Sequence, residues 1–174
     1  MRSADVIHDW WVPQLGNKMD LVPGRSNYLW LNIHEPGTYL GACSEFCGAQ
    51  HAWMRINVIA QTDSDFNKWL AENAKAAVKP TDQLAMKGAE LFQSKSCASC
   101  HRIQGTPAAA EVGPDLTHLA NREELMTGLM KNNEENLFKW VNHPQSIKPG
   151  AHMPDFNFNK DSVNAIVHYL EELK

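Results

Sequence analysis

Residues 43–54 read Cys-Ser-Glu-Phe-Cys-Gly-Ala-Gln-His-Ala-Trp-Met. They supply two thiolates, Cys43 and Cys47, followed by the imidazole of His51 and the thioether of Met54. Soft ligands of this kind suit copper. A cysteine pair alone would also fit a disulfide, half of a zinc site or a copper-delivery motif. With the upstream imidazole of His8, the set suffices for two copper ions that share one valence electron, and sharing the electron favours fast electron transfer.

A second motif, Cys97-Ala-Ser-Cys100-His101, uses the other two cysteines of the chain. This spacing lets both sulfurs form thioethers with the vinyl groups of one porphyrin, and it places the adjacent His101 beneath the iron as an axial ligand. A zinc site or a redox disulfide is the alternative, but zinc would need a second ligand pair at similar spacing. The motif therefore predicts a covalently attached haem c.

Met153 is the predicted sixth ligand of the haem iron. It lies in the segment Pro149-Gly-Ala-His-Met-Pro154, which Gly150 and Pro154 can shape around the haem edge. A thioether there holds the iron at the high potential that an electron carrier needs. The alternative ligands are four histidines, His118, His143, His152 and His168.

The first 62 residues are rich in β-strand and turn signals. Residues 5–12, 28–33 and 55–60 carry β-branched and aromatic residues or alternate between apolar and polar, and prolines and glycines separate them. Short strands joined by such turns favour a sandwich. Because three or four strands rarely close a stable sandwich, we expect its opening strands to lie on another chain or to have been lost.

From Thr62 onward the pattern is helical. Residues 63–80 predict a helical linker with Phe66, Trp69 and Leu70 on one face. A second helix is predicted over 83–94, where Leu84, Gly88, Leu91 and Phe92 share a face. Further helices are predicted over 122–131, over 134–142 and from Asp161, the last with Val163, Ile166, Val167 and Leu170 facing inward. The sequence thus predicts a β-rich partial sandwich (1–62), a linker (63–80) and an all-α domain (81–174).

Composition limits the function further. The chain has 174 residues, of which 43% are apolar and 21% charged, and its net charge of -4 gives no reason to expect nucleic acid. It shows no apolar stretch that would span a membrane and no signal peptide. Haem attachment and metal-binding thiols usually belong outside the cytoplasm, so we expect an export or anchoring element elsewhere. No Ser/His/Asp arrangement or paired carboxylates suggest catalytic residues, and electron transfer is the predicted role.

Residues 81–174 resemble a class I cytochrome c. Gly88 and Phe92 match the first helix of that family, and Tyr169 matches the aromatic residue that packs across it. The segment Gly113-Pro114-Asp115-Leu116 matches the one whose proline carbonyl accepts the ring N–H of the proximal histidine, here His101. Trp140 matches a residue often found near the haem propionates, although it could equally pack a core.

The first part of the chain resembles subunit II of haem–copper cytochrome c oxidases, over residues 3 to about 70. The matching segments are Ser3-Ala-Asp-Val-Ile-His8, Lys18-Met-Asp20, Pro23-Gly-Arg25, Gly37-Thr-Tyr39 and Cys43-Ser-Glu-Phe-Cys-Gly48. The resemblance implies a cupredoxin-like domain with a binuclear copper centre (CuA). Cys43 and Cys47 would bridge both coppers, His8 and His51 would each bind one, and Met54 and the Glu45 carbonyl would complete them. The Glu45 side chain is implied as a possible magnesium ligand beside subunit I.

A cytochrome c behind the copper domain resembles the caa-type oxidases. The implied function is passage of electrons from haem c to copper and on to subunit I, which reduces oxygen, at the extracytoplasmic face of the bacterial cytoplasmic membrane. The implied partners are subunit I, other oxidase subunits and an upstream donor, either a cytochrome c or a quinol-oxidising complex. Family members begin with two membrane helices, several strands and a Trp-rich motif that this sequence lacks, so membrane association would come from a missing part or from partners.

Two other functions fit the sequence, and a third does not. A copper-containing nitric oxide reductase could use a similar subunit. Nitrous oxide reductase carries such a copper pair but needs a large second copper domain, which is missing here. A free periplasmic cytochrome with a vestigial copper segment would bind haem without stoichiometric copper.

Overall fold

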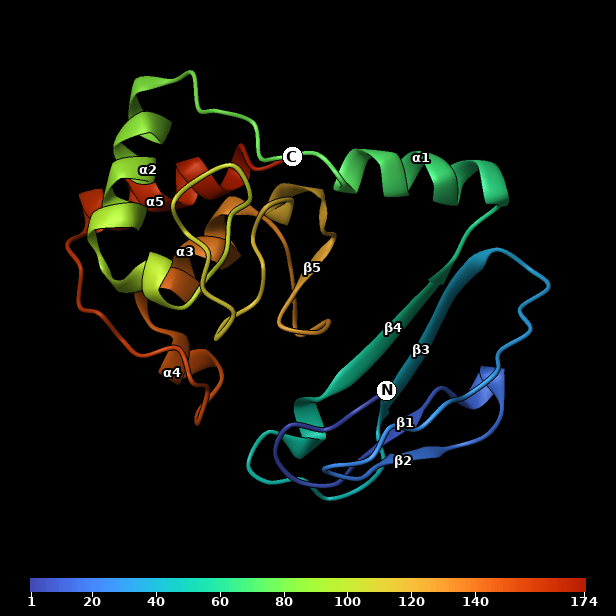
Figure 1. Ribbon diagram of the computed structural model, residues 1–174. Helices are drawn as coiled ribbons and strands as arrows, with labels where there is room; N and C mark the ends of the chain where they lie inside the picture. Colours follow the sequence, from blue (N-terminus) through green and yellow to red (C-terminus); the bar gives the residue numbers. More distant parts are fainter. The chain divides into compact units, whose positions relative to one another are not determined.

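The protein, in a computed structural model of residues 1–174, forms two compact units (Figure 1). The first comprises Met1–Lys68 with Met126–Leu129, and the second comprises Trp69–Leu125 with Met130–Lys174. None of the helices combines the length and the apolar character that crossing a membrane requires.

The first unit is built on one antiparallel sheet with the strand order β2-β1-β3-β4. These strands are β1 (His8–Trp11), β2 (Met19–Leu21), β3 (Gly37–Cys43) and β4 (Arg55–Ala60). Two short 3-10 helices lie between them, η1 (Pro13–Leu15) and η2 (His51–Trp53). Trp10 of β1 is paired with Cys43 of β3. Because the two strands are antiparallel, this register brings the first residues of β1 to the end of β3.

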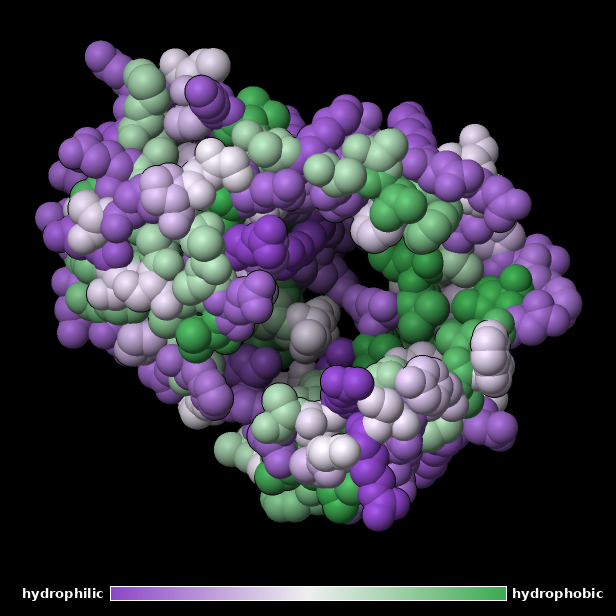
Figure 2. Space-filling model, in the orientation of Figure 1, coloured by the Kyte–Doolittle hydropathy of each residue, from purple (hydrophilic) through white to green (hydrophobic).

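Few side chains of this unit are buried. Val12 is fully buried, and Asp9 and Cys43 are 6% and 7% exposed. Large apolar side chains instead reach the surface of the protein (Figure 2), among them Val6, Ile7, Tyr28, Trp30, Leu31, Leu40, Phe46 and Ile59. The unit has a single four-stranded sheet, which is one of the two layers that a complete sandwich would have. The prediction of a β-rich partial sandwich is therefore confirmed.

The strand predictions succeed only in part. The predicted strands over 5–12 and 55–60 are confirmed by β1 and β4, but the predicted strand over 28–33 is wrong. Residues 28–33 form no strand, and Trp30 is 94% exposed, because no neighbouring strand pairs with this alternating segment. The strand β3 was not predicted, because its glycines lower its apparent β propensity. One of them, Gly41, permits close pairing, since a Cβ there would lie 2.7 Å from Val12 Cγ2.

The second unit packs α2 (Gln83–Ser94) and α3 (Glu134–Asn142) against α5 (Lys160–Glu171). Where α2 meets α5, a Cβ on Gly88 would lie 2.6 Å from the Ala165 carbonyl carbon. Beside this contact the Phe92 and Tyr169 rings meet edge to face at 6.0 Å. The core of this unit is apolar and includes Ala85, Ile103, Leu119, Leu125, Leu137, Val141, Val163, Ile166, Val167, Leu170 and Leu173.

The helix predictions are confirmed at four places. α1 (Asp63–Asn73), α2, α3 and α5 match predicted helices, and Asp82 caps α2 by accepting hydrogen bonds from the N–H groups of Leu84 and Ala85. Leu84 was wrongly placed on the inner face of α2, since it is 41% exposed. The predicted helix over 122–131 is wrong as well. That segment forms a hairpin of β5 (Glu124–Leu125) and β6 (Met130–Lys131), because Met126, Thr127 and Gly128 all have positive φ.

Three short elements and the later part of the linker, from Trp69 onward, complete the second unit. The elements are η3 (Ser96–Ser99), η4 (Leu119–Asn121) and α4 (Pro144–Ile147). After α1 the chain runs without regular structure until α2. Ala77 N–H donates to the Gln104 carbonyl at 3.0 Å, and His118 Nε2–H donates to the Lys75 carbonyl at 3.1 Å. These contacts attach the end of the linker to the loop that follows the Cys97–His101 motif.

Candidate metal centres

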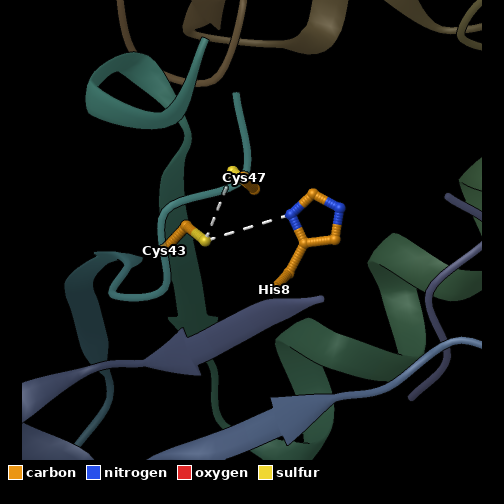
Figure 3. Close-up of side chains that lie close together, drawn as sticks. All are labelled: His8, Cys43 and Cys47. Carbon is orange, nitrogen blue, oxygen red and sulfur yellow. Dashed lines mark hydrogen bonds between the residues drawn. The ribbon is translucent and has the colours of Figure 1, made fainter. Parts of the chain in front are cut away.

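Four side chains of the first unit form a cluster of sulfur and imidazole donors. Cys43 Sγ lies 3.8 Å from Cys47 Sγ and 3.9 Å from His8 Nδ1 (Figure 3), and Cys47 Sγ lies 3.6 Å from His51 Nδ1. The ligand atoms of His8, Cys43 and Cys47 all lie within 4.8 Å of one another. Both imidazoles therefore present Nδ1 to a cysteine, with the two sulfurs between them.

The local fold explains this gathering. His8 begins β1 and Cys43 ends β3, and the pairing of these strands brings both residues to one end of the sheet. Gly48, with φ of +116°, turns the chain after Cys47, and η2 then begins at His51. Positive φ favours glycine because it has no Cβ. Residues far apart in sequence and residues of one tight loop thus share one site.

Glu45 and Met54 lie at the same site through their main chains. The Glu45 carbonyl oxygen is 3.2 Å from Cys43 Sγ, while its side chain is exposed. The Met54 carbonyl accepts a hydrogen bond from Cys43 N–H at 2.9 Å. The main chains of both predicted ligands therefore border the cysteines.

The two thiols have different acidities. Burial raises the pKa of Cys43, but hydrogen-bond contacts with the Asp9 and Glu45 main chain and with the His51 and His8 rings outweigh it and lower the pKa to about 7. Burial, and then the neighbouring Cys43 sulfur, raise the pKa of Cys47. Two thiolates at this separation repel each other unless a cation lies between them. The site therefore favours metal binding, and its soft donors fit copper.

Sequence reasoning missed a carboxylate beside His8. Asp5 Oδ1 lies 2.8 Å from His8 Nε2, the ring nitrogen that faces away from the cysteines. The three-residue spacing of Asp5 and His8 was the available signal, but only the structure shows the contact. The second imidazole, His51, meets the edge of the Phe46 ring at 5.7 Å instead.

The second candidate site is the Cys97–His101 motif at η3. Both cysteines are free and partly buried. His101 Nδ1–H donates to the Pro114 carbonyl at 2.8 Å, as the family resemblance implied. A Cβ on Gly113 would lie 2.6 Å from His101 Cε1, so this glycine lets the chain approach the ring closely. The hydrogen bond at Nδ1 leaves Nε2 as the nitrogen that could bind iron, which fits a proximal haem ligand.

Gln145 of α4 holds the segment that carries Met153, a role that sequence reasoning missed. Its Nε2 donates to the carbonyls of Ala151 and Met153, both at 2.7 Å. Its Oε1 accepts from Gly150 N–H at 3.1 Å. A single side chain thus bridges three main-chain groups of this loop.

The other predicted residues have identifiable surroundings. Trp140 lies half-buried on α3. Of the alternative axial ligands, His118 donates to the Lys75 carbonyl, and His168 Nε2 lies 3.0 Å from Asp82 Oδ2. His143 caps the end of α3, and His152 is exposed. Two of the four histidines are therefore engaged in contacts of their own.

Known families account for both parts of the chain. Residues 85–174, half of the chain, match the family model described as cytochrome c. The chain belongs to the cytochrome c family. In front of this cytochrome c domain, residues 1–61 match the model described as cytochrome C oxidase subunit II, periplasmic domain. The chain thus joins a subunit II segment to a cytochrome c, as the sequence predicted. At the level of these families, the prediction of copper and haem c is supported.

Curated relatives match along the whole chain. The chain is 39% identical to cytochrome c oxidase subunit 2 of Alkalihalophilus pseudofirmus over 175 residues, which cover 100% of this chain and 50% of the relative. It is 34% identical to the subunit 2 of Bacillus sp. strain PS3, covering 99% and 51%. The chain therefore spans about half the length of the curated relatives it matches.

One solved structure is also similar. It is the periplasmic domain of subunit II of cytochrome oxidase of Bradyrhizobium japonicum, 39% identical, with a TM-score of 0.40. The match covers 41% of this chain and 51% of that one.

Proposed function

We propose that the chain is the electron-transfer part of subunit II of a caa-type cytochrome c oxidase. Residues 1–62 would form part of a cupredoxin-like domain with a binuclear copper centre, residues 63–80 a linker, and residues 81–174 a domain with covalent haem c. The main support for this proposal is that one chain contains both a cytochrome c domain and a cluster of sulfur and imidazole donors, formed by His8, Cys43, Cys47 and His51. When bound, the two groups supply one-electron chemistry, each by cycling between two oxidation states.

In the copper site, Cys43 and Cys47 are the proposed bridging ligands. Their 3.8 Å separation, with one imidazole Nδ1 beside each sulfur, supports this assignment. His8 and His51 are the terminal ligands, and Met54 and the Glu45 carbonyl complete the set. The 3.2 Å contact between the Glu45 carbonyl and Cys43 Sγ supports the carbonyl as a ligand. The exposed Glu45 carboxylate is free to bind magnesium at a contact with subunit I.

In the haem site, Cys97 and Cys100 are the proposed attachment points and His101 and Met153 the axial ligands. The Pro114 carbonyl orients the His101 ring and raises its basicity. Gln145 restrains the loop that carries Met153. Trp140 is proposed to lie near the haem propionates.

The assembled complex is proposed from the subunit II relatives. Subunit I would accept the electrons and reduce oxygen, and other oxidase subunits would complete the assembly. A cytochrome c or a quinol-oxidising complex would act as donor. The site would work at the extracytoplasmic face of the bacterial cytoplasmic membrane. A linker of about 20 residues makes the encounter between the two sites intramolecular, which raises their effective concentration.

Electron transfer between the two sites within one chain is the testable part. The full chain, loaded with haem and copper, is reduced at the haem by a photoreductant, and the haem and copper absorption bands are followed in time. We expect haem reoxidation and copper reduction to proceed together at a rate independent of protein concentration. The variant H51A should lose this phase. The variant H34A, which removes an exposed histidine of the same unit, should keep it. Equal kinetics in H51A and in the unsubstituted chain would refute the proposal.

A further inference from the structure

The His8 ring is held from both sides. Its Nε2 lies 2.8 Å from Asp5 Oδ1, and its Nδ1 lies 3.9 Å from Cys43 Sγ (Figure 3). A carboxylate can only accept a hydrogen bond, so Nε2 carries the ring hydrogen. The lone pair of the neutral imidazole is then on Nδ1 and points toward the cysteines. The contact with Asp5 therefore selects the tautomer that a metal between the sulfurs requires.

Asp5 is itself fixed and ionised. Ser3 Oγ–H donates to Asp5 Oδ1 at 3.0 Å, and Asp5 N–H donates to Ser3 Oγ at 3.3 Å. An exposed aspartate is ionised at neutral pH, so a negative charge faces the His8 ring at 2.8 Å. Since the side chain of Asp5 is 68% exposed, it does not serve to fill a core.

The second imidazole of the cluster lacks such a partner. His51 Nδ1 lies 3.6 Å from Cys47 Sγ, as His8 Nδ1 faces Cys43. Away from the cysteines its ring meets the edge of Phe46, and no ion pair with a carboxylate like that between His8 and Asp5 is formed at His51. A hydrogen bond to a carboxylate raises the basicity of a ligating imidazole. The two rings therefore differ as donors although each faces one sulfur.

We propose that Asp5 is a positioning residue for the copper site, which orients His8 through Nε2 and makes its imidazole a stronger donor than that of His51. This inference rests on the copper site proposed above. Asp5 favours the oxidised form of the copper bound to His8, because the more basic ring and the nearby negative charge stabilise the higher positive charge. The shared electron is consequently distributed unequally over the two coppers. Without the Asp5 charge, the potential of the site rises and the distribution becomes more even.

Three variants of the full chain, loaded with haem and copper, test this inference. D5N retains an oxygen that can accept from Nε2–H but removes the charge. D5A removes both. D20N removes a charge from β2 in the same sheet and serves as the control, since Asp20 is paired with Asp9 rather than placed beside His8. The measurements are copper affinity, the reduction potential of the copper site, and the electron paramagnetic resonance hyperfine structure.

We expect D5A to bind copper about 10- to 100-fold more weakly, the usual effect of removing the partner of a ligating histidine. D5N should keep the copper stoichiometry but show a higher potential and a changed hyperfine pattern, while D20N should match the unsubstituted chain. Rescue of affinity by D5N, without rescue of the potential, separates the hydrogen bond from the charge. If D5N and D5A match D20N in all three measurements while the unsubstituted chain binds its copper pair, this inference alone is overturned. If the unsubstituted chain binds no copper pair, the proposed function fails and this inference falls with it.

Discussion

Replacing Gly88 by alanine should destabilise the cytochrome c domain. The new Cβ would lie 2.6 Å from the Ala165 carbonyl carbon and 2.7 Å from Tyr169 Cβ, whereas an ordinary contact is 3.4 Å or longer. Because the nearest atom, the Ala165 carbonyl oxygen, belongs to the backbone, α2 and α5 must move apart, and this movement loosens the neighbouring Phe92–Tyr169 ring contact. Overpacking of this kind costs about 1–3 kcal/mol, and the better helix propensity of alanine offsets ~1 kcal/mol.

With a backbone clash the cost lies at the upper end, so we expect a net loss of about 2 kcal/mol. For a domain of this size, that corresponds to a fall in Tm of about 8–16 °C. The assay is thermal unfolding of the haem-loaded full chain, followed by far-ultraviolet circular dichroism. K87A, at the exposed neighbouring position on α2, is the control and should change Tm little. A Tm for G88A at or above that of K87A would refute the close-packing argument.

Three further predictions concern other glycines and a helix cap. G113A should push the His101 ring off the Pro114 carbonyl, which changes the haem absorption spectrum; an unaltered spectrum would contradict the close approach at Gly113. G105V should release the linker, because its Cβ would lie 2.9 Å from Ala76 Cβ at a φ of +88°, and should speed proteolysis between residues 74 and 79. G16V has a similar φ but no neighbour within 4 Å, and should not affect that cleavage. The hydrogen bond from Ala85 N–H lowers the pKa of Asp82, the residue that caps α2. This cap therefore stabilises the fold fully above pH 3.8, and the stabilisation is lost as the pH falls through the lowered pKa of Asp82. The difference in urea midpoint between D82A and the unsubstituted chain should therefore vanish at low pH, and a constant difference would count against the cap.

Helices could be predicted where caps and apolar spacing, which depend on nearby residues only, indicate them. Asp82 as a cap and the spacing of Val163, Ile166, Val167 and Leu170 depend only on neighbours in sequence, and α2 and α5 follow the prediction closely. The segment 122–131 has helix-favouring residues, but the positive φ values at Met126 and Thr127 form a turn that those preferences do not reveal. Local propensity is overridden where the chain must reverse.

Strand formation depended on pairing with neighbouring strands, which the sequence alone does not identify. Residues 28–33 alternate well yet pair with nothing, whereas β3 pairs on both sides despite its glycines. Gly41 is required there by the closeness of Val12, a reason visible only after folding. β-strand preference mostly reflects such surroundings.

The candidate sites divide in the same way. Copper and haem could be predicted from the residue types of the cysteine and histidine motifs, because each cofactor binds only a few kinds of ligand. The partners around them did not follow from spacing. Asp5 acts on His8 through a loop held by Ser3, and Gln145 reaches three main-chain groups at once. Contacts of this kind depend on loop conformation, so only the structure identifies them.

The most direct test of the account is the metal content of the chain, matured with haem c and reconstituted with copper, together with its electron paramagnetic resonance spectrum. Two copper ions per haem iron, with hyperfine structure from one electron shared over both, is the predicted result. Haem with no copper, or with copper whose spectrum shows an electron confined to a single ion, would contradict the claim that this chain builds a binuclear copper site beside its cytochrome c.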